Sequence, residues 1–83
     1  MIYHTTIIFK RDGETIGEPT TLWLRGRWLS NAERKAMDIA QRKPLFRCAT
    51  AVRILCESTD GKSTSLCWLL SHTPRPLPEK NFA

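Results

Sequence analysis

The dipeptide Asp-Gly occurs twice in this chain, at Asp12-Gly13 and Asp60-Gly61, each time between two runs rich in β-branched and aromatic residues. Asp-Gly favours a tight β-hairpin because both residues tolerate positive φ angles. The runs that flank the two copies cover residues 2–10, 14–25, 46–57 and 63–71. The chain is therefore predicted to fold as two hairpins, one in each half.

The register of each hairpin follows if Asp-Gly is its two-residue loop. Phe9 then lies opposite Ile16 in the first hairpin, while Gly17 and Pro19 interrupt the returning strand. Because proline cannot donate to a strand ladder, that strand is predicted to lie at a sheet edge or to carry a bulge. In the second hairpin this loop pairs Ile54 with Cys67, and a slip of one residue would exchange the faces.

A helix is predicted between the hairpins. The segment 30–33, Ser-Asn-Ala-Glu, has the pattern of a capping box, and Pro44 disfavours helical geometry beyond about Lys43. The stripe that would face the sheet is Ala32, Ala36, Met37 and Ala40, with Ile39 at its margin. The expected fold is α+β: a small antiparallel four-stranded sheet in ββαββ order, with the helix packed on one face. Residues 1–72 form a single domain in this interpretation, and 73–83 an unanchored proline-rich tail.

Positive charge is concentrated in the middle of the chain, which carries a net charge of +5. Between residues 25 and 53 the only acidic side chains are Glu33 and Asp38. The basic side chains of this segment are Arg25, Arg27, Arg34, Lys35, Arg42, Lys43, Arg47 and Arg53. Such a segment attracts phosphate backbones or acidic protein surfaces, and a merely solubilising surface is an equally good interpretation.

The expected outer face of the second hairpin is unusually apolar. In the register above, Arg53 pairs with Trp68 and Leu55 with Leu66 on the face away from the helix. Arginine beside an exposed aromatic ring is common both at protein interfaces and on surfaces that stack single-stranded nucleic acid. Leu66 and Trp68 therefore join the basic residues as predicted binding residues. The alternative is that the tail or the region of Trp23 and Trp28 covers this face.

Other function classes find little support. No stretch approaches the ~20 apolar residues of a membrane span, and the N-terminus does not have the pattern of a secretory signal. Cys48, Cys56 and Cys67 lack the short spacing of zinc sites and are expected to be free thiols in the core, in a cytoplasmic protein. We expect no metal and no cofactor. Neither His4 nor His72 has neighbours that suggest a catalytic triad, so no enzyme is expected.

The first half of the chain resembles short proteins carried in accessory regions of enteric phages and prophages. The resemblance lies in the strand Ile2–Ile8, in Trp23-Leu24-Arg25, and in Leu29-Ser30 leading to Glu33 and Met37. The second hairpin and the proline-rich tail depart from it. The resemblance implies a mobile-element protein that acts on host machinery, such as a defence inhibitor of the anti-CRISPR type. It transfers no functional residues.

Two functions are consistent with these patterns. The first is a non-enzymatic module that binds nucleic acid or a host nucleoprotein complex through the basic segment and the exposed aromatic face. The second is an inhibitor that binds a host protein through the Trp68 face, with charge steering the association. The sheet edge or the Trp68 face would also serve a homodimer. No membrane partner is expected.

Overall fold

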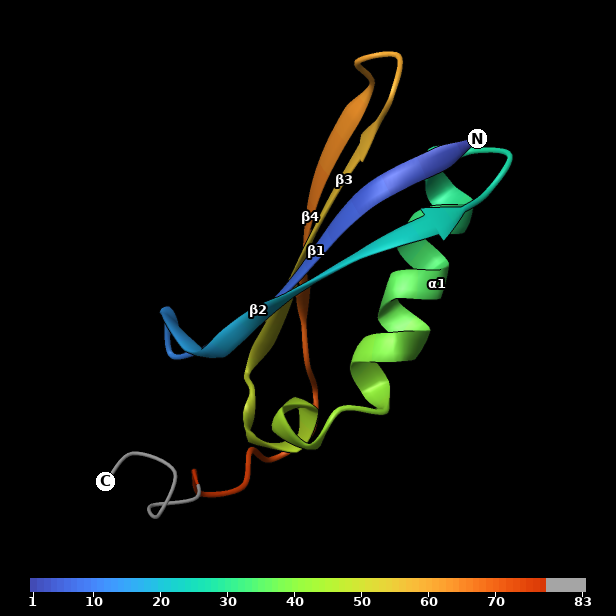
Figure 1. Cartoon of the computed structure of the whole chain (residues 1–83). Helices are drawn as coiled ribbons and strands as arrows, with labels where there is room; N and C mark the ends of the chain where they lie inside the picture. The colour runs from blue at the N-terminus through green and yellow to red at the C-terminus, as the bar shows by residue number, and fades with distance from the viewer. Residues whose placement is uncertain (78–83) are drawn as a thin grey trace.

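A computed structural model describes residues 1–77 of the 83-residue chain. Its elements are β1 (Ile2–Arg11), β2 (Glu14–Arg25), α1 (Leu29–Gln41), the 3-10 helix η1 (Pro44–Cys48), β3 (Ala51–Ser58) and β4 (Ser63–Leu69). The strands form one antiparallel sheet in the order β2-β1-β3-β4, and α1 packs on one of its faces (Figure 1). The predicted α+β class and ββαββ order are confirmed.

The β1–β2 hairpin forms as predicted. Asp12 and Gly13 both have positive φ angles, of 51° and 88°, and Phe9 pairs with Ile16. Beyond Gly17 the register shifts, so β2 carries the predicted bulge, and β2 is an edge strand. Gly17 has a φ of +66°, and a Cβ at this position would collide with the side chain of Leu45, so only glycine suits the bulge.

The predicted register of the β3–β4 hairpin is wrong by one residue. Ile54 pairs with Leu66 rather than Cys67, and Arg53 pairs with Cys67 rather than Trp68. The loop has three residues, 59–61, because the Ser58 amide donates to the Lys62 carbonyl at 2.7 Å. Three-residue loops that end in a left-handed glycine are the next most common hairpin connection after two-residue loops. Side chains alternate along a strand, so this slip places every residue of β4 on the face opposite to the predicted one.

Helix α1 lies across the face of the sheet formed by the odd-numbered residues of β1. Ala32, Ala36 and Ala40 are completely buried, as predicted, and the absence of bulky side chains lets the helix axis approach Ile7 and Ile54 closely. The predicted capping box is wrong. Leu29 is the first helical residue, and the side-chain oxygen of Asn31 accepts the Trp28 N–H at 2.9 Å. Ser30 is an exposed residue of the first turn, so it does not cap the helix.

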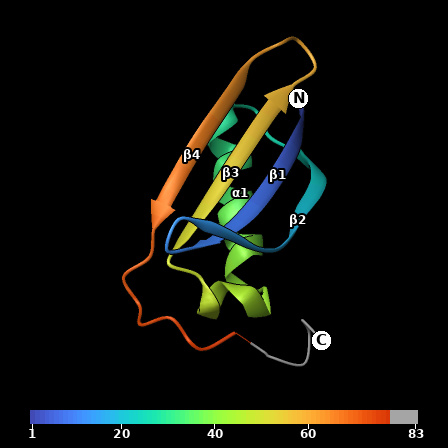
Figure 2. The ribbon, with the colours of Figure 1, turned by 90° about the vertical axis from the view of Figure 1, so that its left-hand side faces the viewer.

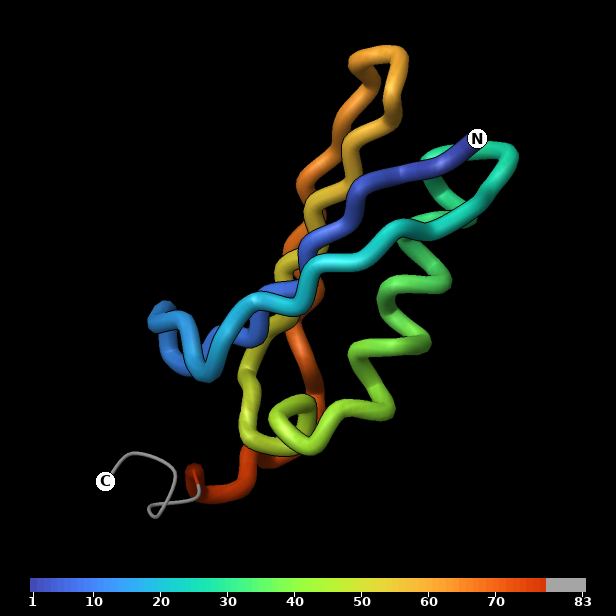
Figure 3. The backbone as a smooth tube through the Cα atoms, viewed as in Figure 1, coloured from blue at the N-terminus to red at the C-terminus, as the bar shows by residue number. Residues whose placement is uncertain are grey.

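The segment after α1 is not part of a strand, although residues 46–50 were predicted to begin one. Pro44 lacks an N–H and starts the 3-10 helix η1, and β3 begins only at Ala51. The C-terminal segment then returns past η1 (Figure 3), with the Arg75 amide donating to the Arg47 carbonyl at 2.8 Å and Leu77 packing against the core. Residues 73–77 are therefore anchored, which corrects the prediction of a free tail. Residues 78–83 of that prediction lie outside the described residues.

Candidate functional site

No helix among residues 1–77 packs on the second face of the sheet. Viewed from that side, the four strands lie in front of α1, and only the β1–β2 turn curls over their lower end (Figure 2). Asp12 and Thr50 hold that turn in place, because the Asp12 amide donates to the Thr50 hydroxyl at 2.9 Å. We call this surface the open face. Its side chains come from the even-numbered residues of β1, from β2 residues such as Trp23, and from the odd-numbered residues of β3 and β4.

An exposed aromatic ring stands at the upper end of the open face. Trp23 pairs with His4 across β1 and β2, and 64% of the tryptophan is exposed to solvent. The two ring centroids are 4.8 Å apart with an interplanar angle of 53°, so the histidine supports one side of the indole. An exposed tryptophan supported in this way offers a flat apolar surface with few conformations to lose on binding.

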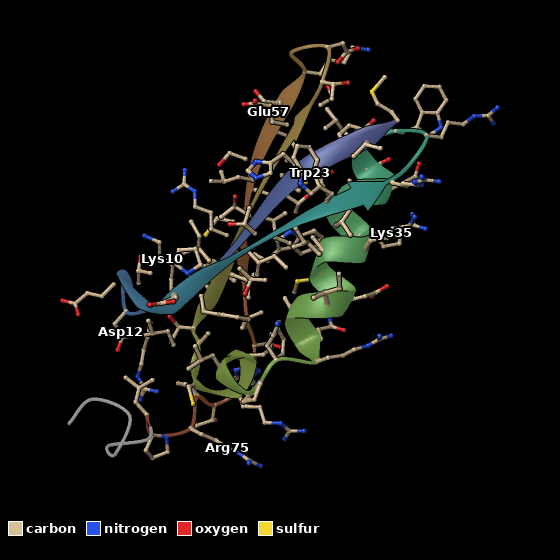
Figure 4. The ribbon with its side chains drawn as sticks, in the orientation of Figure 1. Lys10, Asp12, Trp23, Lys35, Glu57 and Arg75 are labelled. Atoms are coloured by element: carbon tan, nitrogen blue, oxygen red, sulfur yellow. The ribbon has the colours of Figure 1, made fainter. Side chains whose placement is uncertain are left out.

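A carboxylate lies in the same row of the sheet. Glu57 pairs with His4 across β1 and β3, and these two side chains together with Trp23 line a pocket of about 250 Å³ that is completed by Ser58, Thr59 and Gly61. Figure 4 shows Glu57 and Lys10 pointing away from α1, on the side opposite to Lys35. The pocket therefore combines an aromatic wall with a hydrogen-bond acceptor.

Cationic side chains continue along the open face below this pocket. Arg53 pairs with Ile8 and Cys67 in the middle of the sheet, and its guanidinium donates to the Ser65 hydroxyl at 3.2 Å. Lys10 lies at the lower end, opposite Ala51. His4 and Lys10 are six residues apart on β1, which at ~3.3 Å per residue separates them by about 20 Å. Half-buried Ile8 and Leu55 fill the surface between these polar groups.

Two predicted binding residues are on the other face. Trp68 pairs with Val52, whose side chain is completely buried beneath α1, and Leu66 pairs with Ile54 in the same layer. Trp68 is 44% exposed and lies beside the helix, where it lines a pocket of about 290 Å³ with residues that include Glu33 and Met37. The predicted pairing of Trp68 with Arg53 on an exposed face is therefore wrong, for the reason of register given above.

The basic segment does not form a single patch. Arg25 and Arg27 precede α1, and the ammonium of Lys35, from the middle of the helix, donates to the Arg25 carbonyl. Arg34 is exposed on the helix itself. Arg42, Lys43 and Arg47 follow the end of α1, about thirteen residues of helix away. Of the eight predicted cations, Arg53 is the one that lies in the middle of the open face.

Sequence reasoning missed His4, Lys10, Trp23 and Glu57 as candidate site residues. One signal was present. Leu22 and Leu24 flank Trp23, and side chains alternate along a strand, so Trp23 must point to the face opposite to that of the two leucines. The pairing of Trp23 with His4 was harder to predict. The bulge at Gly17 changes the β1–β2 register, and the size of a bulge does not follow from the glycine alone.

The three cysteines differ in their exposure to solvent. Cys48 and Cys56 are buried, whereas Cys67 is exposed on the open face, which corrects its predicted place in the core. Within residues 1–77 no three His, Cys, Asp or Glu side chains are grouped so that they could hold a metal ion. Burial raises the pKa of the Cys56 thiol; the hydrogen bond from Thr5 lowers it, and the negative charge of Glu33 raises it further.

The described part of the chain has no helix with the length and apolar character needed to cross a membrane. No protein-family model matches the sequence, and no curated protein and no solved structure is similar enough to this chain to count as a match.

Proposed function

We propose that this protein binds single-stranded nucleic acid on the open face and acts by binding rather than by catalysis. The observation that carries the proposal is the exposed Trp23, which is 64% accessible, is backed by His4 and lies on a sheet face that no helix of the described residues covers. A four-stranded antiparallel sheet with aromatic side chains on its free face is a surface that RNA-binding domains use to stack bases.

Stacking supplies the sequence-independent part of this binding. Every nucleobase has a π face, and stacking one base on an aromatic side chain stabilises the complex by ~1–3 kcal/mol. The lower half of the same face supplies charge: Arg53 and Lys10 lie on the path that leads away from Trp23. Arg53 lies opposite Ile8, two residues from Lys10 along β1, which is about 7 Å along the strand. One flexible single strand can therefore contact both side chains with its phosphates.

Glu57 gives the pocket a preference among the bases. A carboxylate only accepts hydrogen bonds, so a base stacked on Trp23 would find a partner for an exocyclic amino group, as on cytosine or adenine. Thymine presents carbonyl oxygens on the corresponding edge and would face the carboxylate unfavourably. We expect cytosine-rich strands to bind more tightly than thymine-rich strands.

The proposal is tested by a salt titration with the Arg53→Gln variant. The probe is a fluorescent cytosine-rich DNA strand of about twelve nucleotides, within the site sizes of ~4–16 nucleotides known for such surfaces. Wild-type affinity should fall steeply with salt, and Arg53→Gln should weaken binding severalfold and reduce the slope of log affinity against log salt by ~0.7, which corresponds to one lost phosphate contact on a single strand.

Arg34→Gln is the matched control, because it removes the same charge from an exposed position on α1. It should leave both affinity and slope nearly unchanged. Equal effects of the two substitutions would contradict a phosphate contact on the open face. Equal affinity for cytosine-rich and thymine-rich strands would contradict the base preference proposed for the Glu57 pocket.

A second candidate is a protein partner at the edge of β4. Leu69 is 85% exposed on the open face and is the last residue of β4. β4 is an outer strand, and its far side has no neighbouring strand among the described residues. Exposed apolar residues on an edge strand favour association with another chain. A host protein complex is the partner that the resemblance to phage proteins implies. Absence of nucleic-acid binding at low salt would favour this candidate over the first.

A further inference from the structure

A third pocket lies at the end of the molecule remote from Trp23. It is an open pocket lined by residues from the end of α1, from η1 and from the C-terminal segment, and its volume is about 360 Å³. The residues that line it are Gln41, Phe46, Arg47, His72, Thr73 and Arg75. It shares no residue with the open face, so the inference below goes beyond the proposed function.

A main-chain hydrogen bond holds the two arginines of this pocket side by side. The Arg75 amide donates to the Arg47 carbonyl at 2.8 Å, which fixes the two residues as neighbours although they are far apart in sequence. The Arg11 guanidinium donates to the carbonyls of Arg75 and Cys48, and so ties the same segment to β1. The backbone is thus fastened independently of the Arg47 and Arg75 side chains.

The lining is rich in hydrogen-bond donors and carries positive charge. Arg47 and Arg75 contribute two guanidinium groups, Gln41 an amide and Thr73 a hydroxyl, and no carboxylate is among the described residues that line the pocket. Two arginines placed together without a carboxylate repel each other, and this repulsion is relieved when an anion binds between them. The guanidinium fork matches phosphate oxygens in a bidentate arrangement.

One wall of the pocket is aromatic. Phe46 and His72 meet edge to face with their ring centroids 5.3 Å apart. The Nε2 atom of His72 lies 3.0 Å from the Ala49 carbonyl oxygen, which can only accept, so Nε2 carries the hydrogen and the ring orientation is fixed. A ligand that fits this lining combines an anionic group with a flat or apolar part.

We propose that this pocket binds a phosphate monoester, with Arg47 and Arg75 on the phosphate and the Phe46–His72 wall beside the group that it esterifies. A monoester carries close to two negative charges at neutral pH and offers three terminal oxygens, which suits two guanidinium groups better than a singly charged carboxylate would. The phosphate could belong to a free nucleotide or to the 5′ end of a nucleic-acid strand, and the two sources share this chemistry.

The test uses the full chain and follows the amide and side-chain NMR signals of Arg47, His72 and Arg75. Adenosine 5′-monophosphate should shift these signals saturably, inorganic phosphate should do so more weakly, and adenosine should not. Arg75→Gln and Arg47→Gln should each weaken nucleotide binding at least tenfold. Arg27→Gln removes the same charge from an exposed loop residue outside the lining and should have no effect.

A pair of otherwise identical strands, with and without a 5′ phosphate, distinguishes the two sources. A gain in affinity from the 5′ phosphate that disappears in Arg75→Gln assigns the site to strand ends, and its absence assigns the site to free nucleotides. Equal binding of adenosine and its monophosphate would overturn the proposal. Nucleotide binding that survives both arginine substitutions, in variants whose melting temperature is unchanged, would overturn it as well.

Discussion

Three cysteines of one chain occupy three different environments here. Cys56 lies on the face of β3 that α1 covers, and burial raises the pKa of its thiol. Cys48 is buried in η1, where its Sγ contacts the Pro76 carbonyl oxygen at 3.6 Å. Cys67 is exposed opposite Arg53. Reaction with alkylating reagents requires the thiolate and access to solvent, so the three thiols should differ strongly in reactivity.

We predict that a maleimide at pH 8 labels one cysteine of the folded protein rapidly, and that this cysteine is Cys67. Mass spectrometry of proteolytic fragments after short labelling gives the site directly. Cys67→Ser should abolish the rapid phase, whereas Cys48 and Cys56 should react only after denaturation. Slow labelling of Cys67 would show that β4 has the register predicted from the sequence, and rapid labelling of Cys56 would show that α1 does not cover β3.

At the scale of elements, the two Asp-Gly hairpins show how far local sequence determines structure. Asp12 and Gly13 both adopt positive φ and form the expected two-residue loop, but in the second hairpin only Gly61 does so. The difference comes from Ser58, whose hydroxyl donates to the Asp60 carboxylate and accepts the Lys62 amide. The hydrogen bond from Ser58 also lowers the pKa of the Asp60 carboxyl.

These hydrogen bonds favour a loop of three residues over one of two, and one added loop residue reverses the faces of β4. The helix and the β1–β2 hairpin were predictable because each depends on local signals: the alanine stripe, Pro44 and Asp12-Gly13. The place of Trp68 depended on a turn whose type is decided by a side chain outside the Asp-Gly pair. For that reason the predicted face of Leu66 and Trp68 was wrong although the strand itself was right.

The corrected place of Trp68 has a measurable consequence. Because Trp68 is half-buried beside α1, Trp68→Ala should lower the free energy of unfolding by about 2 kcal/mol, less than the ~3–5 kcal/mol of a fully buried aromatic residue. The folded variant should bind nucleic acid like the wild type. Leu69→Ala, one residue along and 85% exposed on the other face, should leave stability nearly unchanged in the same denaturant titration. Weakened binding with unchanged stability in Trp68→Ala would contradict the observed register.

At the scale of the whole molecule, one helix is too little to cover both faces of a four-stranded sheet. The core is therefore confined to the layer between α1 and the sheet, where three alanines limit its thickness, and the opposite face keeps exposed Trp23 beside His4. The sequence pattern predicted such an exposed face but assigned it to the second hairpin. The net charge of +5 is distributed over both ends of the molecule and the open face, so that charge density alone does not identify the site.

The most direct test of the proposed function compares Trp23→Ala with Trp28→Ala. The two tryptophans are 64% and 65% exposed, but Trp28 lies before α1 and caps the helix only through its backbone. Its N–H donates to the Asn31 side-chain oxygen, and its carbonyl accepts the Asn31 N–H. Affinity for a cytosine-rich single strand is measured by fluorescence anisotropy at low salt. The account predicts a loss of roughly tenfold to a hundredfold for Trp23→Ala, in line with ~1–3 kcal/mol for one stacked base, and almost none for Trp28→Ala. Equal affinities of the two variants would contradict it.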